Sequence, residues 1–298
     1  MGAADRTAPP APAARAAGAE LSGLDALERG ATAVRGRLAR ATAALWPKLA
    51  AVALALAAWQ LVTWTHWREP WQLPGPGPVL GQLVEDLRQG ALERATAITL
   101  GRAAVGYALA AVIGTAVGVA VARQRLLRAA VASAITGLQT MPSIAWFPLA
   151  ILLFQLNEGA ILFVVVLGAA PAIANGVISG VDHVPALLLR AGRALGARGP
   201  AFYRHVLLPA ALPGYVAGLK QGWAFAWRSL MAGELLVIIA ERPSIGVRLQ
   251  FAREFADAKD ILAIMLVILA IGIVVDAVGF GAVERAIRRH RGLTDDTL

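Results

Sequence analysis

The sequence contains no cysteine, and it is poor in charged and aromatic residues. Among its 298 residues, charged types make up 16% and aromatic types 6%, whereas hydrophobic types reach 58%. The absence of cysteine excludes disulfides, thiolate metal sites and a cysteine nucleophile. Together with a mean hydropathy of +0.63, this composition is too apolar for an ordinary soluble domain. It predicts an integral membrane protein.

Motifs for catalysis and nucleotide binding are missing as well. The sequence has no G-x-x-x-x-G-K-[ST] phosphate loop, no His-Glu-x-x-His zinc motif and no Gly-x-Ser-x-Gly elbow. Its four histidines, His66, His183, His205 and His290, fall in expected loops or tails. We therefore expect that the chain is not an enzyme and binds no cofactor or metal. Energy for any transport has to come from another subunit or from an ion gradient.

Six apolar runs approach the ~20 residues that a helix needs to cross the hydrocarbon core of a membrane. They lie at residues 48–65, 95–122, 129–155, 159–181, 213–240 and 261–283. We predict an all-α integral membrane protein whose domain of six transmembrane helices occupies residues 46–284. Residues 1–45, rich in alanine and proline, are expected to form a disordered to amphipathic cytoplasmic tail. Residues 285–298 are expected to form a cytoplasmic C-terminal tail.

Positive charge is unevenly distributed between these runs. Arginines are frequent in the N-terminal tail, at 123–128, at 184–212 and after residue 284, and an even number of spans places all four segments on one side. The loops after the first and fifth runs carry fewer. By the positive-inside rule, both termini are predicted to be cytoplasmic in a multi-pass protein of the bacterial inner membrane. The net charge of +9 therefore requires no nucleic-acid partner.

The segment 184–214, VPALLLRAGRALGARGPAFYRHVLLPAALPG, is a basic insert between two apolar runs. From Leu187 to Leu195, leucine and alanine recur at three- and four-residue spacing, which predicts a short amphipathic helix. Gly196 can end this helix in a left-handed conformation. A partner protein can bind such a helix and move the two spans that it connects. Alternatively, the helix lies in the lipid headgroups.

The spacing within this insert closely resembles the cytoplasmic EAA loop of the membrane subunits of bacterial ATP-binding-cassette importers. That loop has Glu-Ala-Ala, three residues, Gly, nine residues and Ile-x-Leu-Pro. The residues that the resemblance assigns to coupling with an ATPase are Arg190, Ala191, Gly192, Arg193, Leu195, Gly196, Val206, Leu208 and Pro209. Position 190 departs from the pattern, because it is Arg where the family usually has Glu. An ion pair made by that Glu is absent or reversed here.

The resemblance extends from about residue 96 to residue 291 and is similar to the subgroup that imports sulfonates, taurine and nitrate. The matching segments are 138–154, 218–220, 232–234 and 252–255. The resemblance implies a type I importer permease with a coupling loop at 184–212, which translocates a small organic or inorganic anion. It further implies a homodimer in the lipid bilayer, two ATPase subunits that hold ATP and Mg, and an extracytoplasmic solute-binding protein. The alternatives are a secondary transporter of a small solute and an importer of the same class with a different substrate.

Arg228 is the most informative polar residue within the expected spans. If its helix begins near Pro213, Arg228 lies ~22 Å along it, past the middle of a ~30 Å core. A charge at that depth costs at least ~2.5 kcal/mol and is usually kept for a path, a partner or a ligand. Arg228 therefore lines a path for an anion, or it forms a buried ion pair with Asp276 or Glu234.

Other residues of the expected spans complete a candidate transport path. Gly214, Gly218 and Gly222 recur every fourth residue, which favours close packing of helices over a role in the path. Pro142 and Pro148 are expected to kink the third span. The residues predicted to line the path are Arg228, Trp227, Lys220, Glu234, Gln139 and Met141.

Overall fold

The computed structural model describes residues 46–290, so that the predicted tail at 1–45 and the last residues, 291–298, lie outside the described part. By its contacts the chain divides into two units, with the boundary between Arg68 and Glu69. The described part of the first unit is built on one helix, Trp46–Trp64, which is long and apolar enough to cross a membrane. Its apolar side chains are exposed within its unit, which is what a lipid-facing helix requires.

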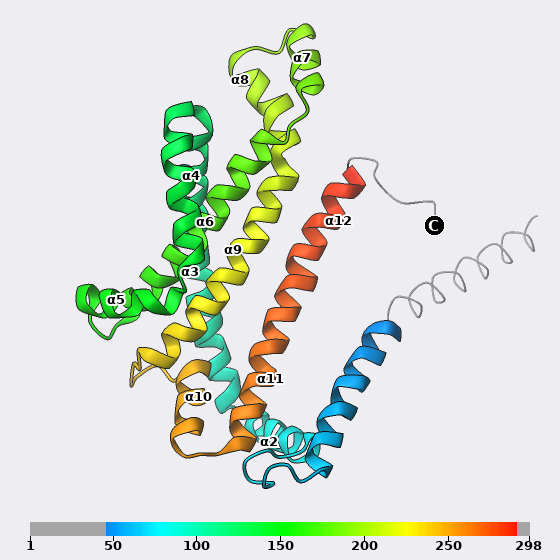
Figure 1. Ribbon diagram of the computed structural model, residues 1–298, viewed down its shortest axis with the longest axis vertical. Coiled ribbons are helices and arrows are strands. Elements are labelled where there is room, and N and C mark those ends of the chain that lie inside the picture. Colours follow the sequence, from blue (N-terminus) through cyan, green and yellow to red (C-terminus); the bar gives the residue numbers. More distant parts are fainter. Residues whose placement is uncertain (1–45, 291–298) are drawn as a thin grey trace, which may run out of the picture. The chain divides into compact units, whose positions relative to one another are not determined.

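All regular elements of the second unit within residues 69–290 are helices, joined by turns and short loops (Figure 1). Its longer elements are α2 (Pro76–Arg88), α3 (Ala91–Arg123), α4 (Arg125–Thr140), α6 (Glu158–Asp182), α9 (Leu208–Leu236), α10 (Ile245–Glu254), α11 (Ala258–Val274) and α12 (Gly281–His290). The shorter ones are η1 (Ser143–Trp146), α5 (Phe147–Phe154), α7 (Ala186–Ala194), α8 (Gly199–Phe202), η2 (Tyr203–Leu207) and η3 (Val275–Phe280). The predicted all-α fold is confirmed.

The ends of the central helices follow from local sequence signals. Asn157 caps α6 by accepting a hydrogen bond from the backbone N–H of Gly159 at 2.8 Å. Asp257 caps α11 in the same way through Lys259 N, at 3.1 Å. Pro76 occupies the first turn of α2, where its missing N–H is not needed.

The six predicted spans are all helical, but they differ in polarity and continuity. The first, second, fourth and sixth form long apolar helices, Trp46–Trp64, Ala91–Arg123, Glu158–Asp182 and Ala258–Ile287. The fifth forms α9, which begins five residues earlier than predicted and is not among the helices apolar enough to count as a span by composition alone. Its polarity suits a helix that is largely covered by protein.

The helix of the third predicted span, 129–155, is interrupted. The segments Ser133–Thr140 and Ser143–Phe154 are bent by 97° relative to each other, as in a broken span or a re-entrant loop. The break lies at Met141, which has an extended backbone with ψ 125° because Pro142 follows it. Pro148 does not break the chain again, since it occupies the first turn of α5, where proline is tolerated.

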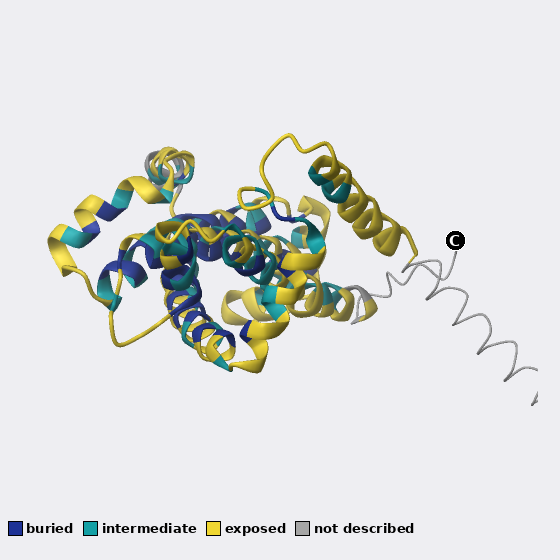
Figure 2. Cartoon of the chain, turned by 90° about the horizontal axis from the view of Figure 1, so that it is seen from below, coloured by how far each residue is buried: buried dark blue, intermediate teal, exposed yellow. Residues whose placement is uncertain are grey.

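The core of the second unit is the contact of α6 with α3 and α9, and buried residues gather along its middle (Figure 2). Helix α6 lies side by side with α9 in Figure 1. Glycines of both helices face each other, so that a Cβ added at Gly218 would lie 2.5 Å from Cα of Gly176. A Cβ added at Gly180 would lie 2.7 Å from the backbone oxygen of Ala211. The packing role predicted for the glycines of α9 is therefore confirmed.

Helix α3 approaches α6 through glycines as well. A Cβ added at Gly114 would lie 2.5 Å from the backbone oxygen of Ala170, and one at Gly118 would lie 2.7 Å from Cβ of Val177. Tyr107 of α3 reaches across to α9, where its hydroxyl donates to the backbone oxygen of Leu219 at 2.9 Å. Three long helices are thus fixed against one another with little room between their backbones.

We expect Gly218→Ala to destabilise the protein, because the added methyl group overlaps Cα of Gly176. Overpacking of this kind costs about 1–3 kcal/mol. Gly101→Ala is the matched control, since nothing lies within 4 Å of a Cβ at this position of α3 and alanine favours helix. Thermal unfolding of the purified protein in detergent checks this, and equal midpoints for the two variants would contradict the proposed contact.

Candidate functional site

The helix predicted in the basic insert is α7, and one glycine holds it against the body of the protein. Gly192 is buried, and a Cβ added there would lie 2.7 Å from Cγ2 of Val206 in η2. A side chain at position 192 would therefore clash with Val206 unless α7 shifted. The prediction of a short amphipathic helix in the insert is confirmed.

The turn after α7 has the geometry expected of a helix stop. Gly196 has φ +86°, a conformation that favours glycine. Its backbone N–H donates to Arg193 O at 3.1 Å, and the N–H of Ala197 donates to Gly192 O at 3.0 Å. The second of these bonds spans five residues, which closes the last turn of the helix.

The remaining residues assigned to coupling lie mostly on the surface. Leu187 and Leu195 are 71% and 88% exposed, which is high for leucine in a folded chain. Arg190 and Ala191 of α7 are exposed too, and so are Leu208 and Pro209 at the start of α9. In Figure 1, α7 and α8 lie together at the end of the second unit where α6 ends and α9 begins.

A second feature is a polar stripe on α9 that no other described element of its unit covers. Its members, Ala217, Gln221, Ala224 and Arg228, are exposed and recur at spacings of four, three and four residues, so that they share one face of the helix. Gly218, Gly222 and Ser229, which pack on α6, lie about 110° around the helix from this stripe, on the buried side of α9. The polar stripe therefore points away from the core.

Arg228 lies near the middle of the bundle, and it has no ion pair among the described residues. Its Nε donates to the backbone oxygen of Ala224 at 3.2 Å, and its guanidinium lies 5.0 Å from the centre of the Phe225 ring. The neighbouring Ser229 contacts Gly168, which is ~15 Å from the start of α6 and ~21 Å from its end at 1.5 Å per residue. Arg228 thus has the depth expected from the sequence.

The alternative in which Arg228 pairs with Asp276 or Glu234 is wrong, because both carboxylates have other partners. Asp276 accepts from Lys220, with Nζ and Oδ1 3.3 Å apart, and Lys220 also lies 3.5 Å from Glu284. Lys220 is among the residues predicted to line the path, and in the structure its charge is balanced by these two carboxylates.

Glu234 was also predicted to line the path, but it is fully buried in a network at the other end of α9. Arg102 of α3 donates to Glu234 at 2.9 Å and to Glu158 of α6 at 2.7 Å. Thr99 donates to Glu234 at 2.9 Å, and the backbone N–H of Gly246 at the start of α10 donates to it at 3.0 Å. Helices α3, α9 and α10 therefore meet on one carboxylate, and α6 joins them through the pair of Arg102 with Glu158.

A second ion cluster lies beside this network and joins α2, α10 and α11. Arg248 of α10 is 3.3 Å from Asp86 of α2 and 3.7 Å from Asp260 of α11. Asp86 is 4% exposed and also accepts from Gln82 at 3.1 Å. These pairs fix α10 from the side opposite Glu234, so that the short helix is tied down at both its start and its middle.

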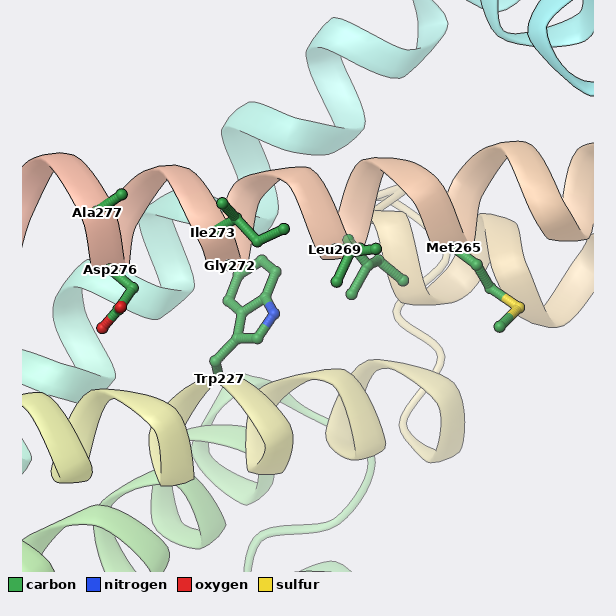
Figure 3. A pocket seen from close by; sticks show the side chains of 8 residues that line it. Trp227, Met265, Leu269, Gly272, Ile273, Asp276 and Ala277 are labelled. Atoms are coloured by element: carbon green, nitrogen blue, oxygen red, sulfur yellow. The ribbon is translucent and has the colours of Figure 1, made fainter. Parts of the chain in front are cut away.

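Trp227 lies on a different face of α9 from Arg228. It is 9% exposed and stacks on Trp223 with ring centres 5.9 Å apart. It also points towards α11, where it borders an open, mostly apolar groove of about 500 Å³ (Figure 3). The groove is lined by Trp227, Met265, Ile268, Leu269, Gly272, Ile273, Asp276 and Ala277.

Gln139 and Met141, the last two residues predicted to line the path, lie on either side of the end of α4. Nε2 of Gln139 is buried without a hydrogen-bond partner among the described residues. Met141 is 40% exposed at the break itself. Within residues 46–290, no three His, Asp or Glu side chains are grouped to hold a metal ion.

The buried network was not anticipated from the sequence, although its members are visible there. Arg102 and Glu234 are 132 residues apart, and Thr99 and Glu234 are 135 apart, so no local pattern links them. The sequence feature that could have indicated the network is the presence of Arg102, Glu158 and Glu234 within or next to apolar runs. Charges at such positions demand partners.

The sequence of the chain is similar to known proteins over most of its length. The family model described as binding-protein-dependent transport system inner membrane component matches residues 102–292. A putative ABC transporter permease protein of Methanocaldococcus jannaschii is 30% identical over 233 residues, which cover 77% of this chain and 86% of that protein. The taurine transport system permease protein TauC of Escherichia coli is 28% identical over 246 residues, covering 81% and 88%.

Two further similarities concern substrate and fold. The bicarbonate transport system permease protein CmpB of Synechocystis sp. is 29% identical over 192 residues, covering 63% of this chain and 68% of that protein. Among solved structures, an inward-facing conformation of the MetNI methionine ABC transporter has a TM-score of 0.56 at 23% identity, covering 66% of this chain and 95% of that chain. At that identity the structure supports the fold alone.

We expect Arg102→Met to destabilise the protein strongly, because it leaves Glu234 buried without a cation. Breaking a buried ion pair from one side costs about 3–5 kcal/mol. Adding Glu234→Gln to this variant should recover part of the loss, since it removes the stranded charge. Arg228→Met is the matched control, because it deletes an exposed arginine that has no ion pair among the described residues. Thermal unfolding of the four proteins checks this, and an Arg102→Met midpoint equal to that of Arg228→Met would exclude a stabilising network.

Proposed function

This chain belongs to the family of binding-protein-dependent transport system inner membrane components, and we propose that it is the permease of an ATP-driven bacterial importer for a small anion. It is a multi-pass membrane protein and a permease subunit of an ABC importer. The anion, such as an aliphatic sulfonate, taurine or a nitrate-like ion, is delivered by an extracytoplasmic binding protein. Two ATPase subunits supply the energy.

The polar stripe of α9 is the observation that supports a path for an anion. A stripe that contains Gln221 and Arg228 is costly against lipid tails, so it faces another protein surface or water. A second copy of the chain meets this requirement, because two stripes related by a two-fold axis enclose a path between them. We therefore propose a homodimer with Arg228 of each copy beside the path.

The charge along the path favours anions over cations. Lys220 is balanced by Asp276 and Glu284, and Glu234 by Arg102, which leaves Arg228 as the cation of the stripe without an ion pair in the described part of the chain. Two of the relatives are named for taurine, which carries a sulfonate, and for bicarbonate, which is itself an anion. A guanidinium binds such oxygens through charge-assisted hydrogen bonds.

The segment from α7 to η2 is suited to receive the ATPase. It is exposed, it connects directly to α6 and α9, and its basic character places it on the cytoplasmic side by the positive-inside rule. A movement of α7 is passed on to α9 through the contact of Gly192 with Val206. A movement of this segment therefore also moves the start of α9, the helix that carries the polar stripe.

We expect Arg228→Gln to lower the uptake of anions by about tenfold or more. Hydrogen bonds to charged groups contribute about 1.5–3 kcal/mol, and 1.4 kcal/mol corresponds to a factor of ten. Arg228→Lys should retain part of the activity, whereas Arg253→Gln, a neutralisation of an exposed arginine on α10, should retain all of it. Initial uptake of radiolabelled taurine, bicarbonate and nitrate into vesicles that carry the full importer checks this.

Unchanged uptake of every anion that the wild-type importer transports would contradict a role of Arg228 in the path. If only a neutral solute is transported, the importer class stands and the anionic substrate is wrong. Equal thermal stability of the variants shows that the effect lies in transport and not in assembly.

We expect Gly192→Ala to uncouple ATP hydrolysis from uptake, because the new methyl group pushes α7 away from Val206. Adding Val206→Ala removes both γ-methyl groups that the new Cβ would meet, at 2.7 and 3.0 Å, and should restore coupling. The number of ATP molecules hydrolysed per molecule imported measures this in reconstituted vesicles. A wild-type ratio for Gly192→Ala alone would show that the contact does not transmit the movement.

A further inference from the structure

The surface of the segment 184–214 carries positive charge only. Arg190, Arg193, Arg198 and Arg204 are all exposed, and the segment contains no aspartate or glutamate. Arg193 lies 5.3 Å from the centre of the Phe202 ring. The other three arginines have no hydrogen bond or ion pair from their side chains within the described part of the chain. The nearby Asp182 is already paired with Arg128 and does not balance them.

The outward face of α7 is asymmetric across its width. Gly192 is buried against Val206 and Leu189 is half-buried, so these residues define the inward side. At 100° per residue, Leu187, Ala191 and Ala194 lie opposite them in the middle of the outward face. Arg190 and Arg193 form one flank of that face, and Leu188 and Leu195 form the other.

This asymmetry distinguishes a protein cleft from a lipid surface as the occupant. A helix that lies in anionic headgroups presents bulky apolar residues to the hydrocarbon, and its cations flank them. In α7 the middle of the face is small, with two alanines beside one leucine, and the cations are on one side only. Small residues allow another backbone to approach closely, and exposed leucines fill pockets.

We propose that the docking cleft of the partner ATPase has two unlike walls, with a carboxylate facing Arg190 and apolar side chains facing Leu188 and Leu195. This inference rests on the proposed function, since it takes the ATPase as the occupant of α7. Leu187 and the two alanines sit at the bottom of the cleft.

The cleft proposed here also sets partner selectivity. An ATPase with a cationic residue on the wall that meets Arg190 is rejected, because like charges brought together in an interface cost several kcal/mol. The permease is then matched to its own ATPase and excluded from ATPases of opposite charge pattern.

A zero-length cross-link tests for the carboxylate directly. Arg190→Lys keeps the positive charge and introduces a primary amine, and the segment 184–214 has no lysine of its own. The full-length variant is purified with the ATPase subunit that copurifies with it, identified by its phosphate-binding loop, and is treated with a carbodiimide. We expect an amide bond between the lysine at position 190 and an Asp or Glu of the ATPase, mapped by mass spectrometry. Arg253→Lys on α10 is the matched control and should give no cross-link to the ATPase.

A photoreactive amino acid at Leu195 tests docking independently of charge. If it attaches to the ATPase while the carbodiimide gives no bond from position 190, docking on α7 stands and the acidic wall is wrong. If the photoreactive residue attaches to lipid and neither reagent links α7 to the ATPase, α7 lies on the membrane. Both the docking of the ATPase on α7 and the two-walled cleft are then wrong.

A charge exchange completes the test with the same purified complex. Arg190→Glu should lower the amount of bound ATPase about tenfold or more, and replacing the mapped carboxylate with arginine should restore it. Arg253→Glu, which changes the net charge equally, should bind the ATPase as the wild type does. Binding by Arg190→Glu equal to wild type would overturn the proposal.

Discussion

The rest of the structure depends on the contact of α6 with α9, in which two helix backbones approach each other through glycine. A Cβ added at Gly218 would overlap Cα of Gly176, so neither position tolerates a side chain. This contact fixes one face of α9 to the core and leaves the face with Gln221 and Arg228 exposed within residues 69–290. The polar stripe is therefore a consequence of the packing.

Two further sets of contacts hold the two ends of α9. At one end, Glu234 gathers α3, α6 and α10 through Arg102 and through hydrogen bonds from Thr99 and Gly246. At the other end, the contact of Gly192 with Val206 ties α7 to the chain that enters α9. Helix α9, which carries the stripe, is thus fixed at one end by the network of Glu234 and connected at the other end to the exposed helix α7. That arrangement suits a protein in which a partner moves a path from a distance.

Local patterns in the sequence predicted the features that depend on neighbouring residues. Hydrophobic runs predicted the helices, the periodicity of Leu187 to Leu195 predicted α7, and glycine spacing predicted the packing of α9. The break at Met141 was predicted only as a kink, because Pro142 specifies that a helix is interrupted but not the 97° direction that the chain takes afterwards. The partners of Glu234, Lys220 and Asp276 were not predicted, since ion pairs between distant helices depend on the relative rotation of those helices.

The most direct test uses the absence of cysteine, because single cysteines can be introduced without removing any native thiol. Ala224→Cys lies on the polar stripe, and Val112→Cys lies on an exposed face of α3, where Val112 is 69% exposed. In membranes, a water-soluble, membrane-impermeant thiol reagent should label the cysteine at position 224 and leave the one at position 112 unlabelled. If the cysteine at position 224 resists the reagent in every nucleotide state while neither variant loses stability, the stripe faces lipid or sealed protein and does not line a transport path.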